Sequence, residues 1–429
     1  QICLRDGFDE NQAYTLVYPA RDPLVLGIGF AATRDLISFL RYAKTDDAGA
    51  PNPVDGLVQN AIGTGTSQSG NFLRTFLNQG FNGDEQDRIV FDGINPNIAA
   101  RQIPLNMRFG VPGGASFMYD PGSDGAVWWT DYNDVARGLG TTSLLSRCRA
   151  RNVCPKIIET FGSAEFWDLR MSPDLVGTDA KADLPIPDNV RRYYLPSTTH
   201  GGGSGRFTTT GDSPVASCKL PGNPLPSSDT MHVALKALID WVRGIGLPPA
   251  SVYPTLAKGD LVEANADAMG WPDIPGGATP NGKLNPLYHY DFGPRFNYTD
   301  VSGVATRLPP RIIGVLPSRV PRVNKDGNET SGVPSVQLLA PLGTYMGWNE
   351  RAEGYGAGGR CYFIGGFIPF ERTKAERLAK RDPRLSLEER YGDHAGYVAR
   401  VKKVVERRIS AGWLLPDDGA RLIAAAEAS

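Results

Sequence analysis

GTGTSQSGNFLRTFLNQ, residues 63–79, is the stretch that decides the fold. The apolar segment 57–62 before it predicts a short buried strand, and the glycines of 63–67 predict a sharp turn. The spacing of apolar residues from 68 to 79 predicts a helix. The stretch therefore predicts a strand, a tight turn that exposes Ser67, and a helix that starts directly after it.

Ser67 is the candidate nucleophile on this turn. In α/β-hydrolases the nucleophile sits on a strained strand-to-helix turn, and small residues two positions before and after it let the backbone pass close to its neighbours. Here these residues are Gly65 and Ser69, which gives a G-x-S-x-S pattern. Ser69 fits worse as nucleophile because Asn71 would take a small position. The backbone N–H of Gln68, at the helix start, is the expected oxyanion donor.

A serine hydroxyl needs a base, and the chain contains only four histidines. His200 follows a predicted strand at 190–195 and enters a loop with Gly201, Gly202 and Gly203. The hydrolase fold places its base after its last strand, so His200 is the candidate base. Packing or surface roles are expected for the others, which lie in a predicted helix, an aromatic stretch and a polar tail: His232, His289 and His394.

The acid that orients the imidazole should follow a strand between the serine and the histidine. The predicted strand 156–161 runs into Glu165, which is the candidate acid. Asp168 is a near neighbour that could replace it. Asp92 follows another predicted strand, at 88–92, and is the alternative position along the chain. For these two aspartates a helix cap or an ion pair is the ordinary expectation.

Strands alternate with helices along the chain, which predicts an α/β fold with a mostly parallel central sheet and helices on both faces. The net charge of −1 leaves no basic field for nucleic acid or an anionic membrane. No segment approaches the length of an apolar membrane span. Cys148 and Cys154 form either a local disulfide or two buried thiols, and no ligand pattern predicts a metal. Residues 324–328 share part of a calcium-loop pattern but predict a β-turn.

The expected organisation is a catalytic domain over 1–250, with a cap insertion at 95–150, and a C-terminal extension over 251–429 packed on the hydrolase core. Trp128 and Trp129 lie in the cap and are candidate substrate-wall residues. Further strands are predicted at 14–20, 23–29, 311–316 and 335–341, and helices at 30–43, 229–243, 371–382, 386–408 and 416–428.

The run from Gly65 to Leu77, followed by Gly80-Phe81-Asn82, resembles a bacterial family of α/β-hydrolase-domain proteins regarded as serine esterases. Other segments that resemble this family lie at 29–35, 128–132, 154–157, 189–194, 200–203 and 388–392. The resemblance covers nearly all of the chain. It implies an α/β-hydrolase fold with Ser67 as nucleophile, His200 as base and Glu165 as acid, and it favours an esterase over a peptidase. It implies no particular substrate.

The chain departs from this family at its N-terminus, where members are longer. About six strands are predicted before residue 200, whereas the fold usually has eight. The N-terminal strands, with the loop that supplies the first oxyanion donor, are therefore expected in a separate N-terminal polypeptide or in a part of the protein not included in this sequence.

The expected function is hydrolysis of a small-molecule or polymer carboxylic ester through an acyl-enzyme, with no metal or organic cofactor, in the periplasm or outside the cell. Two alternatives remain open. Gly27, Gly29 and Ala32 form a G-x-G-x-x-A pattern typical of a dinucleotide-binding oxidoreductase, although Asp46 and Asp47 lie in a loop rather than after a second strand. The chain could instead be a non-catalytic binding protein on a hydrolase scaffold.

Overall fold

The computed structural model describes residues 3–9, 14, 27–101, 125–296, 306–307 and 310–429. In these residues no helix has both the length and the apolar character to cross a membrane. In chain order the elements are α1 (Ile28–Tyr42), β1 (Ile62–Thr66), α2 (Gln68–Asn78), β2 (Gly93–Asn97), β3 (Tyr132–Asp134), β4 (Gly140–Thr142), α3 (Ser146–Ala150), β5 (Lys156–Gly162), α4 (Ser163–Trp167), α5 (Ser172–Val176), β6 (Val190–Leu195), α6 (Ser228–Val242), β7 (Leu261–Val262), α7 (Ala266–Met269), β8 (Leu287–Asp291), β9 (Arg311–Leu316), β10 (Val320–Pro321), α8 (Val336–Leu339), β11 (Gly343–Tyr345), β12 (Phe367–Pro369), α9 (Lys374–Lys380), α10 (Leu387–Tyr391), α11 (His394–Ser410) and α12 (Pro416–Glu427).

The central sheet has four parallel strands in the order β1-β2-β5-β6. Because parallel strands end at the same edge of a sheet, the loops after β1, β5 and β6 meet there. These loops begin at Ser67, Ser163 and Pro196. The predicted mostly parallel sheet is confirmed in these strands, and its geometry brings together three loops that are far apart in the sequence.

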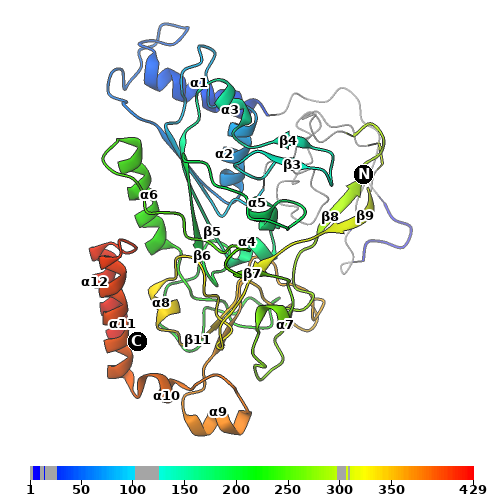
Figure 1. Ribbon diagram of the computed structural model, residues 1–429, viewed down its shortest axis with the longest axis vertical. Coiled ribbons are helices and arrows are strands. Elements are labelled where there is room, and N and C mark those ends of the chain that lie inside the picture. Colours follow the sequence, from blue (N-terminus) through cyan, green and yellow to red (C-terminus); the bar gives the residue numbers. More distant parts are fainter. Residues whose placement is uncertain (1–2, 10–13, 15–26, 102–124, 297–305, 308–309) are drawn as a thin grey trace.

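Helices cover both faces of this sheet (Figure 1). Successive residues of a strand point to opposite faces, so Ile157 and Ile158 enter different cores. Ile157 packs with the α2 residues Leu73 and Phe76. Ile158 packs with Leu238 and other residues of α6. The predicted layering, with helices on both faces, is thereby confirmed.

Several element boundaries differ from the sequence prediction. The strand expected at 57–62 is β1 at 62–66, so the glycine-rich segment itself forms the strand. The helix α2 packs closely on this strand, because a Cβ at Gly63 would lie 3.1 Å from the Leu73 side chain, which would have to shift slightly. The strand expected at 88–92 is β2 at 93–97, and the strand expected at 335–341 contains the helix α8, capped by the Ser335 side chain.

The predicted cap insertion overlaps the sheet at its start, because residues 95–97 belong to β2. Its later part holds the β3–β4 hairpin and α3, which contacts α2. A disulfide joins Cys148 to Cys154, the first of the two alternatives for this pair. Residues 102–124 of the cap lie outside the described residues, as does most of the strands predicted at 14–20 and 23–29.

The C-terminal part shares its core with the sheet. Phe161 and Tyr194, from β5 and β6, pack in one buried cluster with Val320 and Trp348. A second disulfide, Cys218–Cys361, joins segments 143 residues apart, and the sequence reasoning had not paired these cysteines.

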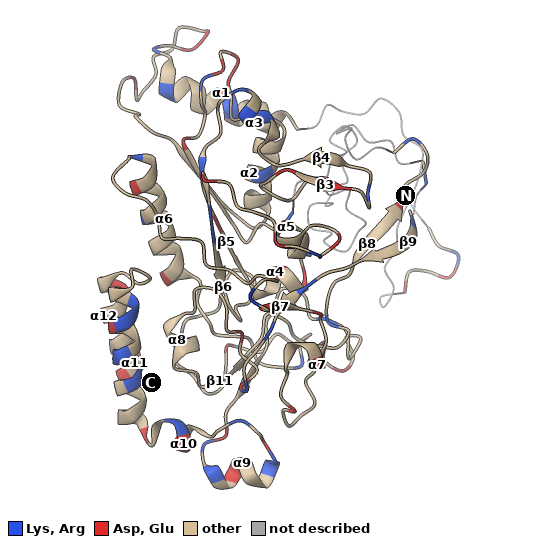
Figure 2. Ribbon diagram, viewed as in Figure 1, with Lys and Arg blue, Asp and Glu red and all other residues tan. Residues whose placement is uncertain are grey.

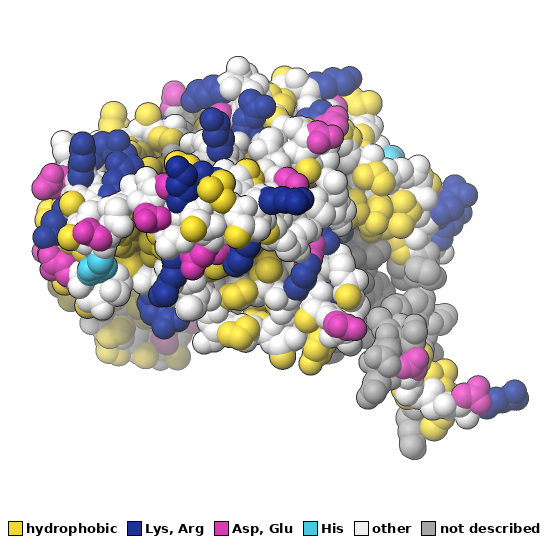
Figure 3. All heavy atoms as spheres, turned by 90° about the horizontal axis from the view of Figure 1, so that it is seen from below, with side chains coloured by type: hydrophobic (Ala, Val, Ile, Leu, Met, Phe, Trp, Pro, Cys, Tyr) yellow, Lys and Arg dark blue, Asp and Glu magenta, His cyan; other side chains and the backbone are white. Residues whose placement is uncertain are grey.

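Charged side chains of both signs are distributed along the outer helices (Figure 2). They also alternate over the face seen from below (Figure 3).

Four charged side chains form a closed, buried ring beneath α2. Arg74 binds Glu159 at 2.6 Å and Asp174 at 2.9 Å. Arg192 binds the same two carboxylates, each at 2.6 Å. None of the four is more than 1% exposed. Because each guanidinium bridges both acids, the charges balance within the ring, which joins α2, β5, α5 and β6.

Candidate active site

The turn between β1 and α2 is strained at the predicted nucleophile. Ser67 has φ 57° and ψ −116°, a conformation that non-glycine residues adopt only where the surroundings impose it. Its N–H donates to the Asn97 carbonyl of β2 at 2.9 Å. A Cβ at Gly65 would lie 2.3 Å from the Ser69 carbonyl oxygen, so only glycine fits at that position.

Ser69 has a role other than the one expected from the G-x-S-x-S pattern. Its side chain is exposed, and its hydroxyl accepts from the Thr66 N–H at 2.8 Å and donates to the Thr66 carbonyl at 2.9 Å. The close approach falls one residue later, because a Cβ at Gly70 would lie 2.6 Å from the Ala99 Cβ. Ser69 therefore closes the turn, while Gly65 and Gly70 let the backbone segments approach.

The structure brings Ser67, His200 and Glu165 together. Ser67 Oγ lies 2.9 Å from His200 Nε2, and His200 Nδ1 lies 2.6 Å from Glu165 Oε1. The Glu165 side chain is fully buried and that of His200 is 14% exposed. These contacts form one continuous chain of hydrogen bonds from a buried carboxylate to a serine hydroxyl, which is the arrangement that activates a nucleophile.

The loops that carry Glu165 and His200 fit against each other through small residues. The second carboxylate oxygen of Glu165 accepts from the Gly162 N–H at 2.5 Å. A Cβ at Gly162 would lie 2.1 Å from Thr198 Oγ1 of the base loop, so glycine is required there. After His200, Gly201 and Gly202 have φ of 83° and 84°, the left-handed region that favours glycine.

The sequence model of a family described as an alpha/beta hydrolase domain matches residues 6–424. The chain belongs to this α/β-hydrolase domain family. The predicted family and fold are confirmed, and hydrolase activity is the function that the family supports. No curated protein and no solved structure matches the chain.

In this hydrolase domain the alternative acids have other partners. Asp92 accepts from the Ala61 N–H at 2.8 Å and pairs with Arg41 at 2.9 Å, a backbone and ion-pair role. Asp168 is buried, and its carboxylate accepts from the Phe363 N–H at 2.9 Å. Glu165 is therefore the carboxylate that contacts the imidazole.

Phe363 is a site residue that sequence reasoning missed. Its ring lies 4.6 Å from the His200 ring, centroid to centroid. Its carbonyl accepts from the Thr199 hydroxyl at 2.7 Å, next to the base. The disulfide at Cys361 ties the same segment to Cys218. No local pattern marks Phe363 because it reaches the site only through tertiary contacts with residues far earlier in the chain.

The buried Asp168 beside this segment predicts a pH-dependent stability. Burial raises the pKa of Asp168 from its ordinary 3.8 to about 7, despite the hydrogen bond from Phe363. The folded state keeps the proton over this interval while the unfolded state has lost it, so this group lowers stability as pH rises from about 4 to 7. Asp168→Asn is expected to gain stability relative to wild type over that interval, measured by urea unfolding at several pH values. A stability difference that does not change with pH would contradict this account.

The remaining predicted site residues differ in their surroundings. Gln68 is the first residue of α2, where a backbone N–H has no intrahelical acceptor and can donate to an oxyanion. Trp128 is fully buried and donates to the Thr142 carbonyl at 2.6 Å. Trp129 is 2% exposed and stacks with the Arg74 guanidinium. Both tryptophans are thus packed in the core among the described residues, and a substrate would have to displace these contacts to reach either indole; their role as a substrate wall stays a prediction.

The dinucleotide pattern has a local structural role in this hydrolase domain. Gly27 is the N-cap of α1 with φ 81°, whereas a Cβ at Gly29 would meet no atom of the described residues within 4 Å. Within the part of the chain that the structure describes, the second glycine is therefore not required by a close approach of the backbone. Asp46 accepts from the N–H groups of Ala48 and Ala50 and closes a turn. Among the described residues no group of His, Cys, Asp and Glu side chains is arranged to hold a metal ion.

Proposed function

We propose that this protein is a serine hydrolase that cleaves carboxylic esters through an acyl-enzyme, with Ser67 as nucleophile, His200 as base and Glu165 as acid. The observation that carries the proposal is the continuous hydrogen-bonded chain from Glu165 through His200 to Ser67. The strained turn at Ser67 supports it, because such strain is typical of a nucleophile presented above a sheet edge.

The proposed reaction follows from this geometry. Ser67 Oγ attacks the ester carbonyl carbon while His200 Nε2 takes the hydroxyl proton, and the Glu165 carboxylate stabilises the imidazolium. The Gln68 N–H donates to the oxyanion. The C–O bond to the alcohol then breaks, and His200 returns its proton to the leaving oxygen. Water deprotonated by His200 attacks the acyl carbon and releases the acid and free Ser67.

We also propose that the protein works in the periplasm or outside the cell. Two disulfides support this location, Cys148–Cys154 and Cys218–Cys361. Disulfides persist in oxidising compartments and are rare in the cytosol. The participation of a separate N-terminal polypeptide, which would supply a further oxyanion donor, stays a prediction.

The proposal is tested by labelling with a fluorophosphonate probe and locating the adduct by peptide mass spectrometry. We expect the adduct on Ser67. His200→Ala is expected to slow labelling by roughly 10³-fold, because the serine loses its general base.

His232→Ala is the matched control, since His232 Nδ1 also contacts a carboxylate, that of Asp418 at 2.8 Å, but on the protein surface. Its labelling rate should equal that of the wild type. An adduct on another residue, or equal labelling of His200→Ala, would refute the assigned roles. No adduct on any residue would favour the non-catalytic binding protein.

A further inference from the structure

Glu329 is a buried carboxyl that contacts both loops of the proposed catalytic pair. Its Oε1 accepts from the Ser163 hydroxyl at 2.7 Å, two residues before Glu165. Its Oε2 accepts from the Ser197 N–H at 2.5 Å, three residues before His200, and from the Tyr194 hydroxyl. The Glu329 N–H in turn donates to Ser197 Oγ at 2.9 Å. The residue is only 7% exposed, so it is buried among these donors.

Ser197 is itself held in an unusual backbone conformation. Its φ is 59°, in the left-handed region where a serine is strained. Glu329 binds this residue from both sides, through its carboxylate and through its backbone N–H. The contact therefore fixes the bend of the chain that leads from β6 to His200.

A rigid turn presents Glu329 to these loops. Residues 324–328 form the predicted β-turn, in which Asn324 Oδ1 accepts from the N–H groups of Asp326 and Asn328. Val323 and Glu329 pair across its base. The Asn328 side chain donates to the Gly343 carbonyl at 3.0 Å and accepts from the Tyr345 N–H at 2.8 Å. The turn is thus bonded to β11.

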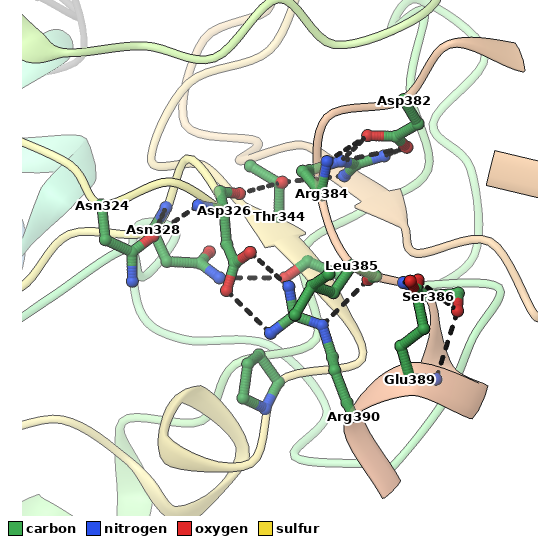
Figure 4. Close-up of polar contacts among 12 residues, drawn as sticks. Asn324, Asp326, Asn328, Thr344, Asp382, Arg384, Leu385, Ser386, Glu389 and Arg390 are labelled. Atoms are coloured by element: carbon green, nitrogen blue, oxygen red, sulfur yellow. Dashed lines mark hydrogen bonds and ion pairs between the residues drawn. The ribbon is translucent and has the colours of Figure 1, made fainter. Parts of the chain in front are cut away.

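Arg390 of α10 extends toward this turn and binds Asp326 (Figure 4). Both of its terminal nitrogens bind the Asp326 carboxylate, one of them at 2.9 Å. Arg384 reaches the same place through Thr344, whose hydroxyl accepts at 2.8 Å and donates to the Asp326 carbonyl. The Asp326 carboxylate therefore binds an arginine, and the segment that shares part of a calcium-loop pattern is a β-turn held in place by this ion pair.

We infer that Glu329 is a positioning residue of the hydrolase, which holds the Glu165 loop and the His200 loop at the spacing that the acid–base hydrogen bond requires. This inference rests on the proposed function. A shared carboxyl links two loops that carry interacting catalytic groups, so any change in its reach changes their separation. Misplacement of a catalytic group by about 1 Å can cost about 100-fold in rate.

Glu329→Gln keeps the length of the side chain and removes its charge, so it separates the effects of these two properties. Burial raises the pKa of Glu329 to about 7, despite the hydrogen bonds from Tyr194, Ser163 and Ser197. A neutral amide of the same length can accept from Tyr194 and Ser197 with its oxygen and donate to Ser163 with its nitrogen. Aspartate keeps the carboxylate but is one methylene shorter, so it cannot reach both loops in their present places.

The experiment compares Glu329→Asp with Glu329→Gln by fluorophosphonate inactivation, with the maximal inactivation rate and the probe affinity measured separately. We expect Glu329→Asp to lower the maximal rate by about 10-fold or more with unchanged probe affinity, and Glu329→Gln to stay within about threefold of wild type. Glu350→Asp and Glu350→Gln are matched controls. Both should react like wild type, because the buried Glu350 carboxylate binds Lys219 and Lys283 instead of the loops that carry Glu165 and His200.

A proton NMR spectrum gives a second readout, independent of reaction with the probe. The proton between His200 Nδ1 and Glu165 Oε1 should give a downfield resonance that weakens in Glu329→Asp and persists in Glu329→Gln. Wild-type reactivity of Glu329→Asp, or equal losses in both Glu329 variants, would overturn the inference. If wild type does not react with the probe, the proposed function fails, and an unchanged resonance in Glu329→Asp would then separately refute the role of Glu329.

Discussion

Glu165→Gln is expected to lower kcat for ester hydrolysis by roughly 10³- to 10⁴-fold. The Gly162 N–H donates to Glu165 Oε2, so the amide oxygen of a glutamine would be held there. Its NH₂ group would then face His200 Nδ1, where the carboxylate oxygen lies at 2.6 Å. Nδ1 would have to accept this hydrogen bond, and the ring proton would move to Nε2. The imidazole could then no longer take the proton of Ser67.

Asp168→Asn is the matched control for this measurement. Its carboxylate accepts only a backbone N–H, from Phe363, among the hydrogen bonds described, and an asparagine oxygen can replace that acceptor. We expect kcat within about tenfold of wild type. Steady-state kinetics on an activated ester give both values. A large loss in Asp168→Asn together with a small one in Glu165→Gln would exchange the roles of the two acids.

Arg74→Met is expected to destabilise the fold by about 3–5 kcal/mol. The substitution leaves Glu159 and Asp174 fully buried with Arg192 as their shared cation. Removing one partner of a buried ion pair strands a charge that water cannot reach, which costs more than the pair contributes. The side chain also contacts the Trp129 ring, so packing is lost as well. Urea unfolding at neutral pH measures the change in the free energy of unfolding.

Lys236→Met is the control on an exposed ion pair. Lys236 and Asp240 are i,i+4 partners on α6, and the lysine side chain is 62% exposed. Such pairs contribute about 0.5 kcal/mol or less, because water screens both charges. Equal destabilisation by Lys236→Met and Arg74→Met would show that burial of the ion-pair ring does not determine how much it contributes to the free energy of unfolding.

Local sequence information predicted the elements whose pattern is self-contained. β6 at Val190–Leu195 and β9 at Arg311–Leu316 have the predicted boundaries, because each is a short segment rich in β-branched, aromatic or leucine residues and bounded by prolines. The helix predicted at 386–408 is broken in the structure into α10 and α11. Gly392 has φ 74° at the end of α10, and the Asp393 side chain caps α11. The charged residues continue across this bend, so the sequence pattern alone predicts a single helix.

Tertiary contacts determine the features of the structure that the local sequence pattern could not predict. A glycine-rich segment was interpreted as a turn, but Gly63 and Gly65 belong to β1 because α2 packs directly against them. Ser67, Glu165 and His200 follow strands of one parallel sheet, so chain order and strand pattern were enough to predict that they lie together, and their catalytic roles stay a prediction. Glu329 and Phe363 follow no such rule. Their places depend on how a later part of the chain packs on the catalytic loops.

The distance along the chain between Ser197 and Glu329 has a consequence for biosynthesis. The two residues are 132 positions apart, and Arg390, which anchors the turn before Glu329, lies later still. Synthesis proceeds from the N-terminus, so Ser67, Glu165 and His200 leave the ribosome well before the segment that fixes their loops. The sheet can form early, but under the proposed function we expect Ser67 to reach its full reactivity only when α10 has been made. A chain that stops before α10 would carry all three proposed catalytic side chains, and we expect it to be a poor catalyst.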